Sequence, residues 1–411
     1  MAALETVESH LALVLGAVHP LPPVTVPLVK AHGRVLAGDL NSALEIPRFT
    51  NSAMDGYAVH FADLEHASTE HPVTLRVRGE VAAGSARDPE FGRGEAVRIL
   101  TGAPMPSAGD AVVPIEHTDG GEREVVITVP PVAGAHIRRA GEDVRVGQTV
   151  LHDGSWLDAA AIAAAAAAGR PSLSARPSPR VAVVATGAEL RAVGDTLARG
   201  QIPDSNSYLV AGLCVEAGAT VVWSGTVDDH PRSLAALLER FTPDEVDLVV
   251  LTGGVGPGNH DVVRIAFGAD AGFRFSHVAM QPGKPQGFGM LRGVTPTFGL
   301  PGNPVSVAVS FELFVRPALL RLQGAAYLHR PRFAVEVVDA WNSPAGRLQV
   351  MPVVFLGANE RGLPRAQRAT AGGSGSHLAG ALAGASGYAF VPPMVTRVEP
   401  GDTLEAIRIG R

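Results

Sequence analysis

Short apolar runs that alternate with helical segments fill residues 177–325, and they constrain the fold more than any other feature. The runs read RVAVVAT, TVVWSGTV and VDLVVLTGG, and helix-like segments such as SYLVAGLCVEAG and SLAALLERF separate them. Apolar runs rich in Val and Leu are typical of parallel strands that are buried on both faces of a sheet. The sequence therefore predicts a central α/β domain built on a doubly wound parallel sheet.

The flanking regions predict further domains, because 411 residues exceed what one hydrophobic core usually organises. Short strands with Gly, Pro and Asp turns predict a small β domain at 47–140, inserted into a helical domain formed by 1–46 and 141–176. The proline-rich linker RPSLSARPSPR marks the start of the central domain, which we place at 177–325. Residues 326–411 again predict β structure. We expect a multidomain protein of α/β and β units.

Composition indicates a small-molecule partner. A net charge of −6 and a pI near 6.2 provide no basic surface, so neither nucleic acid nor a membrane is expected as a partner. The acidic N-terminal segment does not resemble a signal peptide, and the alanine run AAAIAAAAAAG is about half the ~20 residues that span a bilayer. The single cysteine, Cys214, excludes an intrachain disulfide and fits a reducing compartment. We therefore expect a cytoplasmic protein.

A glycine-rich loop, LTGGVGPGNHD at 251–261, follows the third apolar run and ends on a carboxylate. It is neither a P-loop nor a G-x-G-x-x-G fingerprint, but such loops suit phosphate-like ligands. Ligands of a parallel sheet bind at the carboxyl ends of its strands, and this chain places acids there. They are Glu189, Asp204, Asp228, Asp229 and Asp261. Taken singly, each of these acids is also typical of a structural role, as a helix cap or in a solvated turn.

Carboxylates beside an anionic ligand require a cation. Two like charges ~4 Å apart repel by about 4 kcal/mol at an effective dielectric near 20. Several such repulsions together are comparable with the binding free energy of a micromolar ligand, which is roughly 8 kcal/mol. A divalent cation between the carboxylates and the anion turns this repulsion into attraction. Carboxylate oxygens select Mg²⁺ or a similar hard ion. We expect the glycine N–H groups to hold the anion while Asp204 and Asp261 hold Mg²⁺.

Lysine usage directs attention to Lys284. The chain has 34 basic residues, of which only Lys30 and Lys284 are lysine. Lys284 stands in the turn MQPGKP, where a compact ammonium suits a single oxyanion. In the following segment, GLPGNPVSV, Asn303 and Pro304 predict the cap and first residue of an apolar helix.

Three upstream loops carry further candidates. NSAMDGYAV contains Ser52 and Asp55, RILTGAPMP exposes Thr101, and IRRAGEDV places Arg138 near Asp143. By its own chemistry, Asp-Gly is a turn signal, and the charged cluster is also typical of solvated surface. The histidines have no zinc-binding spacing, and no serine or cysteine stands in a nucleophile elbow.

Eight motifs together resemble the molybdopterin molybdenumtransferase family, the bacterial relatives of the gephyrin E domain. They are NSAMDGYAV, RILTGAPMP, AGEDV, ATGAEL, DSNSYL, TGGVGPGNHD, PGKP and GLPGNPVSV, in this order along nearly the whole chain. The resemblance implies a helical domain, an inserted β domain, a central domain similar to molybdopterin adenylyltransferase, and a C-terminal β barrel. It also implies a homodimer whose cleft lies between one subunit's central domain and the other's inserted domain.

The family reaction converts adenylated molybdopterin and molybdate, with Mg²⁺, into molybdenum cofactor and AMP. Molybdopterin adenylyltransferase and apo molybdoenzymes are the further partners that the resemblance implies. Combining the resemblance with the strand-end residues, we expect the following site. Catalytic roles fall to Asp55, Thr101, Asp143, Glu189 and Lys284, and metal binding to Asp204, Asp261 and Glu189. Substrate contacts are expected from Ser52, Arg138, Asp228, Gly253, Gly254, Gly256, Gly258, His277, Gln281, Pro301, Asn303 and Ser376.

One departure from the family concerns the positions just ahead of PGKP. Many members place lysines there, whereas this chain has His277 and Gln281. A protonated His277, or Arg138 or Arg139, could replace the missing charge, and the sequence leaves this open.

Two alternative functions also stay open. The first is ATP-dependent adenylyl transfer to molybdopterin, which ATP consumption would reveal. The second is a non-catalytic scaffold or binding module similar to the gephyrin E domain, which loss of the metal-binding acids would favour. These acids are present.

Overall fold

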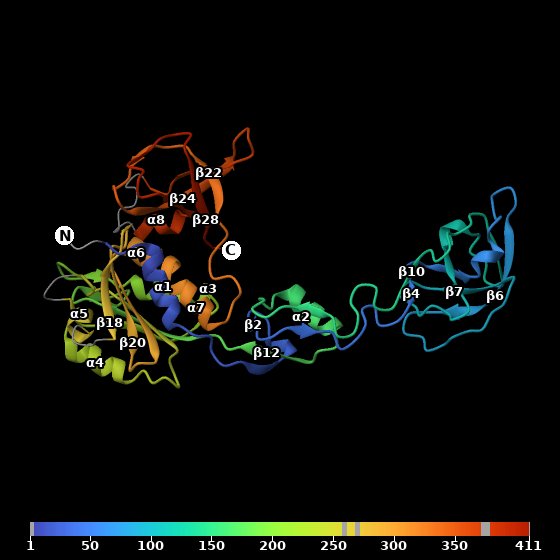
Figure 1. Ribbon diagram of the computed structural model, residues 1–411, viewed down its shortest axis with the longest axis horizontal. Helices are drawn as coiled ribbons and strands as arrows, with labels where there is room; N and C mark the ends of the chain where they lie inside the picture. Colours follow the sequence, from blue (N-terminus) through green and yellow to red (C-terminus); the bar gives the residue numbers. More distant parts are fainter. Residues whose placement is uncertain (1–3, 257–260, 268–271, 371–378, 411) are drawn as a thin grey trace.

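The computed structural model describes residues 4–256, 261–267, 272–370 and 379–410, which form an elongated molecule (Figure 1). The central domain and the C-terminal barrel lie side by side at one end, and the inserted β domain lies at the other. A slender segment that carries α2 (Ala159–Ala167) connects the two ends. Within these residues, no helix has the length and apolar character that a bilayer crossing requires.

A six-stranded sheet organises the central domain, in the order β16-β13-β17-β21-β20-β18. Its strands are β13 (Arg180–Thr186), β16 (Thr220–Val227), β17 (Leu248–Thr252), β18 (Phe273–His277), β20 (Pro285–Leu291) and β21 (Thr295–Leu300). The first four strands of that order are parallel, as predicted, but β20 and β18 pair antiparallel, so the sheet is mixed. Only short connections join these last strands, and parallel pairing needs a longer crossover.

Helices cover both faces of this sheet, which explains the unbroken apolar runs of β13 and β17. The expectation that TVVWSGTV is also buried is wrong, because β16 is the edge strand of the sheet and none of its residues is buried. On one face lie α1 (Val7–Ala17), α3 (Asn206–Glu216), α6 (Pro304–Ser310), the π-helical turn η4 (Phe311–Val315) and α7 (Arg316–Leu322). On the other lie α4 (Pro231–Glu239) and α5 (Val262–Phe267). Along β13, Val181 and Val183 face the first layer while Ala182 and Val184 face the second, so every position is buried.

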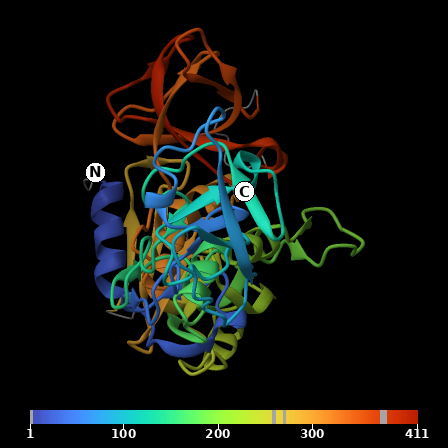
Figure 2. The same cartoon turned by 90° about the vertical axis from the view of Figure 1, so that its right-hand side faces the viewer.

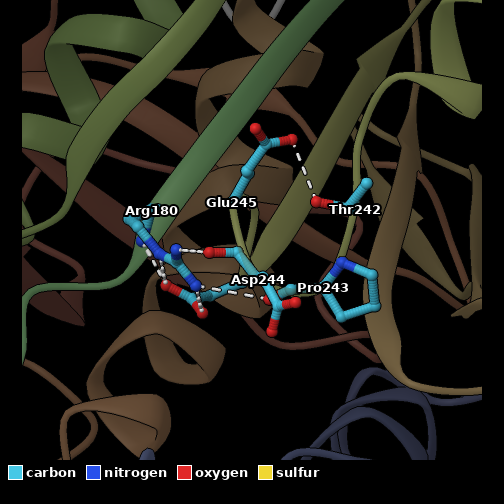
Figure 3. Close-up of polar contacts among 6 residues, drawn as sticks. Arg180, Thr242, Pro243, Asp244 and Glu245 are labelled. Carbon is cyan, nitrogen blue, oxygen red and sulfur yellow. Dashed lines mark hydrogen bonds and ion pairs between the residues drawn. The ribbon is translucent and has the colours of Figure 1, made fainter.

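Arg180 anchors the beginning of β13 to the loop that leads into β17 (Figure 3). Its Nε and Nη2 donate to the two carboxylate oxygens of Asp247, at 2.9 and 2.8 Å, and it also donates to the carbonyls of Asp244 and Pro243. Such bidentate pairs are strong and geometrically specific. The anchor lies at the amino end of the strand, opposite the carboxyl end that borders the cleft.

The expected helical domain formed by 1–46 and 141–176 is not evident as a separate helical unit, and this part of the prediction is wrong. Helix α1 packs on α7 and η4, where Val7 and Val14 join the main core of the central domain. The large apolar face of that domain buries the stripe of α1 better than the alanines of α2 would.

The rest of this region is a small α/β unit. Helix α2 is capped by Asp158, which accepts a hydrogen bond from the N–H of Ala161 at 2.8 Å. It packs over β1 (Val24–Pro27), β12 (Ser172–Arg176) and β2 (Val35–Leu36), and beside the pair of β3 (Leu40–Asn41) and β11 (Thr149–Leu151).

The inserted β domain is a five-stranded sheet in the order β8-β5-β7-β6-β9. The strands are β5 (Gly56–Val59), β6 (Val73–Val81), β7 (Glu95–Ile99), β8 (Ala111–Pro114) and β9 (Glu124–Ile127). A two-stranded pair, β4 (Asn51–Ser52) with β10 (Ile137–Arg138), closes the end of the domain where the chain enters and leaves. The core of this domain is separate from those of the central domain.

The C-terminal residues form a closed five-stranded barrel, which confirms the β barrel that the resemblance implies (Figure 2). Its strands are β22 (Phe333–Val337), β24 (Leu348–Ala358), β25 (Pro364–Arg368), β26 (Gly387–Val391) and β28 (Thr403–Arg408), accompanied by β23 (Trp341–Asn342), β27 (Arg397–Val398) and α8 (Ala379–Gly384). Strand β19 (Met280–Gln281) of the central domain pairs with β24 and joins the two domains.

Candidate active site

A cleft of about 750 Å³ opens at the carboxyl ends of β13, β17 and β21. The predicted residues that line it are Glu189, Asp204, Gly253, Gly254, Gly256, Asp261, Pro301 and Asn303. Parallel pairing brings these distant segments to one edge of the sheet. The rule that ligands bind at the carboxyl ends of parallel strands therefore located the cleft correctly.

The glycine loop forms one wall of the cleft because only glycine fits it. Gly253 and Gly254 have positive φ angles of 89° and 63°. A Cβ on Gly253 would lie 2.5 Å from the carbonyl oxygen of Thr186, and a Cβ on Gly254 would lie 3.1 Å from the backbone nitrogens of Val262 and Val263. The loop is thus pressed between the end of β13 and the start of α5, and its backbone faces the cleft.

Four carboxylates surround this loop. Asp204 is only 4% exposed, and its oxygens accept hydrogen bonds from the N–H (3.1 Å) and the hydroxyl of Ser207 in the first turn of α3. The Asp261 carboxylate lies 2.8 Å from where a Cβ on Gly256 would stand. The Glu189 carboxylate oxygens lie 2.8 Å from where a Cβ on Gly187 would stand, and Asp229 accepts from the N–H of Ala188 at 2.7 Å.

These carboxylates are suitable ligands for a hard cation, although they do not form a ready-made cage. Among the described residues, no three His, Cys, Asp or Glu side chains are grouped closely enough to hold a metal by themselves. Mg²⁺ commonly binds through one or two carboxylates together with waters and substrate phosphates. A set of oxygen donors around a loop that accepts anions therefore fits Mg²⁺ shared with a ligand.

Asp228 and Asp229 follow the same strand but have different surroundings. The Asp228 carboxylate turns toward the start of α4, where hydrogen bonds from Ser233 and from the N–H of His230 lower its pKa. It is not among the residues that line the cleft, whereas Asp229 is. The sequence predicted a substrate contact for Asp228, whereas Asp229 is the residue that lines the cleft. Their order in the sequence carries no signal for this, because only the backbone turn after β16 decides which of them points inward.

The turn that carries Lys284 lies beside the cleft. Lys284 is half-buried and precedes Pro285, which lines the cleft at the start of β20. His277 is exposed and pairs with Pro285. Gln281 accepts a hydrogen bond from Nη1 of Arg347 at 3.2 Å. Arg347 comes from the C-terminal barrel, and the sequence analysis missed it because contacts between domains leave no local pattern.

A second group of predicted residues lies on the inserted β domain. Asp55 accepts hydrogen bonds from the N–H and the hydroxyl of Thr101, both at 2.7 Å, and these bonds hold its pKa below the usual range. Ser52 is buried and donates to the carbonyl of Met54 at 2.6 Å. Arg138 is exposed on β10, which pairs with β4 beside Ser52.

One chain does not bring the two groups together. The inserted domain and the central domain, which carries the cleft, lie at opposite ends of the elongated molecule (Figure 1). Asp143 is exposed in the connection between them, where its N–H donates to the carbonyl of Ile46 at 3.0 Å. Gly258 and Ser376, two further predicted residues, lie outside the described residues.

Comparisons with known proteins cover almost the whole chain. The MoeA N-terminal region (domain I and II) matches residues 5–169, the "Probable molybdopterin binding domain" matches 184–321, and the MoeA C-terminal region (domain IV) matches 334–409.

Full-length relatives agree with these matches. The chain is 40% identical over 408 residues to molybdopterin molybdenumtransferase 2 of Mycobacterium tuberculosis, which covers 98% of this chain and 99% of the relative. It is 32% identical over 419 residues to molybdopterin molybdenumtransferase 1 of that organism, covering 98% of both. A crystal structure of the molybdopterin biosynthesis MoeA protein from Pyrococcus horikoshii aligns with a TM-score of 0.80 at 30% identity, over 99% of both chains. A second structure of that protein aligns with a TM-score of 0.83 at 27% identity, over 99% of this chain and 100% of the other.

Proposed function

Because this chain belongs to the MoeA-type molybdopterin molybdenumtransferase family, we propose that it inserts molybdenum from molybdate into adenylated molybdopterin and releases AMP. The single observation that carries this function is the cleft, in which a glycine backbone loop and four carboxylates meet at one sheet edge. A phosphoanhydride and a dianionic oxyanion are the substrates for which such a pairing of anion-binding backbone and acidic side chains makes chemical sense.

The glycine loop binds the anionic part of adenylated molybdopterin. Its backbone lines the cleft, where no side chain can occupy Gly253 or Gly254 without a clash, and the N–H of Gly253 itself donates to the carbonyl of Leu300 at 3.0 Å. Pro301 and Asn303, on the neighbouring loop after β21, line the opposite wall. This arrangement orients the substrate without adding positive charge, so the acids beside it still require a cation.

Asp261 and Glu189 would hold Mg²⁺ most directly. Asp204 would contribute to the same site only in part, because both of its oxygens already accept hydrogen bonds from Ser207. When bound, Mg²⁺ would supply the positive charge that anionic substrates need beside these carboxylates.

Molybdate binds beside the turn at Lys284. The Lys284 ammonium offers a point charge for one oxyanion. Arg347 lies against Gln281, so it brings a guanidinium to the position at which many family members have a lysine. The charge that seemed to be missing from the sequence thus comes from the C-terminal barrel.

The inserted domain of a second subunit completes the site. Asp55, Thr101, Arg138 and Asp143 are carried at or near that domain, far from the cleft of their own chain. A homodimer with two-fold symmetry places the inserted domain of each subunit at the cleft of the other, since an isologous interface is reciprocal. There the Asp55 carboxylate, kept ionised by Thr101, accepts a hydrogen bond from the substrate.

Turnover with defined substrates tests this function. Purified protein is incubated with adenylated molybdopterin, molybdate and Mg²⁺, and we expect AMP release together with activation of an apo molybdoenzyme. Turnover that instead consumes ATP would support adenylyl transfer. Absence of both reactions would support a binding module.

The metal assignment is tested separately with Asp261→Asn. We expect AMP release to fall by roughly tenfold or more, because a carboxylate ligand is lost. Asp153→Asn is the matched control, since Asp153 lies outside the cleft and accepts a hydrogen bond from the N–H of Gly38. Undiminished AMP release by Asp261→Asn at saturating Mg²⁺ would contradict the assignment.

A further inference from the structure

Glu5 carries a nearly buried carboxylate that no step of the proposed reaction uses. Its side chain is only 10% exposed, although it stands in the short segment that leads into α1. A carboxylate at this depth is costly unless charged or hydrogen-bonding groups surround it. The groups that surround Glu5 therefore indicate what this segment of the chain does.

Two elements, α1 and β18, supply partners for the Glu5 carboxylate. From α1, Nδ1 of His10 lies 3.3 Å from Oε2, and the hydroxyl of Ser9 donates to Oε1 at 3.4 Å. From β18, Nη2 of Arg274 lies 3.4 Å from Oε1. The Glu5 side chain thus ties the beginning of α1 to the edge of the central sheet.

His10 is held firmly in its place in α1. It is only 1% exposed, and its ring meets the ring of Phe314 in η4 edge-on, with 4.8 Å between the ring centres. Burial lowers the pKa of His10, so the ring is neutral near pH 7. Since an ionised carboxylate only accepts hydrogen bonds, the proton of the neutral ring belongs on Nδ1, which faces Glu5. The packing of the ring therefore also fixes the position of the carboxylate.

The backbone of Glu5 pairs with the connection between β18 and β20, residues 278–284, which we call the lysine loop. The N–H of Glu5 donates to the carbonyl of His277 at 2.9 Å, and the N–H of Ala279 donates to the carbonyl of Glu5 at 2.7 Å. These bonds form a parallel bridge between Glu5 and Val278. The segment before α1 therefore lies as a short additional strand along the beginning of the lysine loop.

The beginning of the lysine loop is bonded directly to its end, where Lys284 stands. The N–H of Val278 donates to the carbonyl of Lys284 at 2.8 Å. Val278 is fully buried, whereas Lys284 is half-buried beside the cleft. A shift of the bridge at Glu5 would therefore reach Lys284 through a single hydrogen bond.

Two further contacts support other parts of the lysine loop. The N–H of Leu348 in the barrel donates to the carbonyl of Ala279 at 2.9 Å. The side-chain amide of Gln286 donates to the carbonyl of Gly283 at 2.6 Å. Glu5 adds to these contacts a connection to α1 and to Arg274, so it holds the loop from the side of the central core.

We propose that Glu5 positions Lys284 for molybdate, because its backbone fixes the beginning of the lysine loop while His10 and Arg274 anchor its side chain. This inference rests on the molybdate site proposed above. Glu5 is a positioning residue, since it contacts the loop rather than the oxyanion. Loss of its carboxylate should therefore weaken molybdate binding and leave the chemical step intact.

Glu5→Ala tests this role in steady-state AMP release. We expect the KM for molybdate to rise at least about threefold, while kcat changes by less than about twofold. A purely structural defect would instead lower the fraction of active enzyme, which lowers kcat and leaves the KM unchanged. Glu8→Ala is the matched control, since Glu8 is an exposed glutamate in the first turn of α1, and it should keep the KM. An unchanged KM in Glu5→Ala would overturn the proposal.

His10→Phe provides a milder second variant. It keeps an aromatic ring against Phe314 but removes the hydrogen-bond donor to Glu5. We expect a smaller rise in the KM for molybdate, again with little change in kcat. A fall in kcat at an unchanged KM would show that this pair only stabilises the fold.

A double variant tests whether Glu5 acts through Lys284. Glu5→Ala combined with Lys284→Gln should have the same KM for molybdate as Lys284→Gln alone, within about twofold, because residues that act through one contact have non-additive effects. Effects of the two substitutions that multiply would show that Glu5 supports the site by another route, and would overturn the assignment.

NMR provides a readout that needs no turnover. The chain has only two lysines, Lys30 and Lys284, so reductive methylation with carbon-13 formaldehyde gives two lysine signals, which Lys30→Arg assigns. Glu5→Ala should move the Lys284 signal and leave the Lys30 signal in place, and an unmoved Lys284 signal would contradict the proposal. Molybdate alone is then titrated, and Glu5→Ala should need a higher concentration to shift Lys284. A Lys284 signal that moves in Glu5→Ala but responds to molybdate in neither protein would support the contact and refute the molybdate site, so the two proposals can fail separately.

Discussion

The carboxylate of Asp55 accepts two hydrogen bonds from Thr101, one from the backbone N–H and one from the hydroxyl, each 2.7 Å long. The antiparallel pairing of Gly56 with Ile99 brings the two residues together across the inserted sheet. Because both donors stabilise the ionised form, they lower the pKa of Asp55 from its ordinary value of 3.8.

Thr101→Val should raise the pKa of Asp55 toward that ordinary value, because the hydroxyl donor is lost while the N–H remains. A lowered carboxyl pKa stabilises the folded state at pH values above the ordinary pKa, and this contribution is lost as pH falls through the lowered value. In the variant this contribution should be smaller, and its loss should be complete at a higher pH. Carbon-13 NMR titration of the carboxyl measures the shift. Thr242→Val, which removes a hydroxyl bonded to Glu245 instead, should leave the Asp55 titration unchanged.

Gly253→Ala should destabilise the fold and disrupt the cleft. The new Cβ would meet the backbone of Thr186 at 2.5 Å, in addition to the strain of a positive φ of 89°. Gly84→Ala provides the matched control, since Gly84 has a φ of 82° with open space around its Cα. We expect the control to lose about 1 kcal/mol and Gly253→Ala to lose 1–3 kcal/mol more, roughly. Equal losses in urea unfolding would show that the clash is relieved at no cost.

Lys284→Gln should raise the KM for molybdate by roughly tenfold, because the proposed molybdate site loses one positive charge. Lys30→Gln is the natural control, since Lys30 is the other lysine of the chain and lies on an exposed turn in the slender segment. Steady-state AMP release at varied molybdate concentration measures the KM of both variants. A KM unchanged in Lys284→Gln would remove this residue from the molybdate site.

Arg330→Met should destabilise the junction between the central domain and the barrel. Glu312 lies on the π-helical turn, and its carboxylate contacts Arg330 at 3.0 Å and Arg316 at 3.8 Å, with only 9% of its side chain exposed. Removal of Arg330 leaves this buried charge poorly paired, so we expect a loss of about 3 kcal/mol at neutral pH in urea unfolding.

The pH dependence of this loss follows from the same carboxyl. Burial raises the pKa of Glu312 above its ordinary value of 4.5, so its contribution to stability is greatest below that value and is lost as pH rises through the raised value. The cost of Arg330→Met should therefore shrink in acid. Adding Glu312→Gln to Arg330→Met should recover most of the loss at neutral pH. A double variant no more stable than the single one would show that Arg330 acts through packing alone.

The local sequence predicted the parts of the protein that depend on neighbours along the chain. The apolar runs VAVVAT and LVVLT became buried parallel strands, while TVVWSGTV became an edge strand, and the glycine loop became the wall of the cleft. Glu189, Asp204 and Asp261 meet at one sheet edge because parallel strands end there together. Each of these outcomes depends on the spacing of apolar side chains or on the backbone conformations that glycine allows. Both can be recognised in a short stretch of sequence.

Only the tertiary structure decided the features that depend on contacts between distant segments. The pairing of β20 and β18 made the sheet mixed, and α1 joined the central core rather than a helical domain. The direction of Asp229 and the contact of Arg347 with Gln281 likewise arise from packing between elements far apart in sequence. Residue order determines which chemical groups the chain can offer. Which of these groups come together depends on how whole layers of helices and strands bury their apolar faces. The free energy of this burial is distributed over the entire fold and is not encoded at any one site.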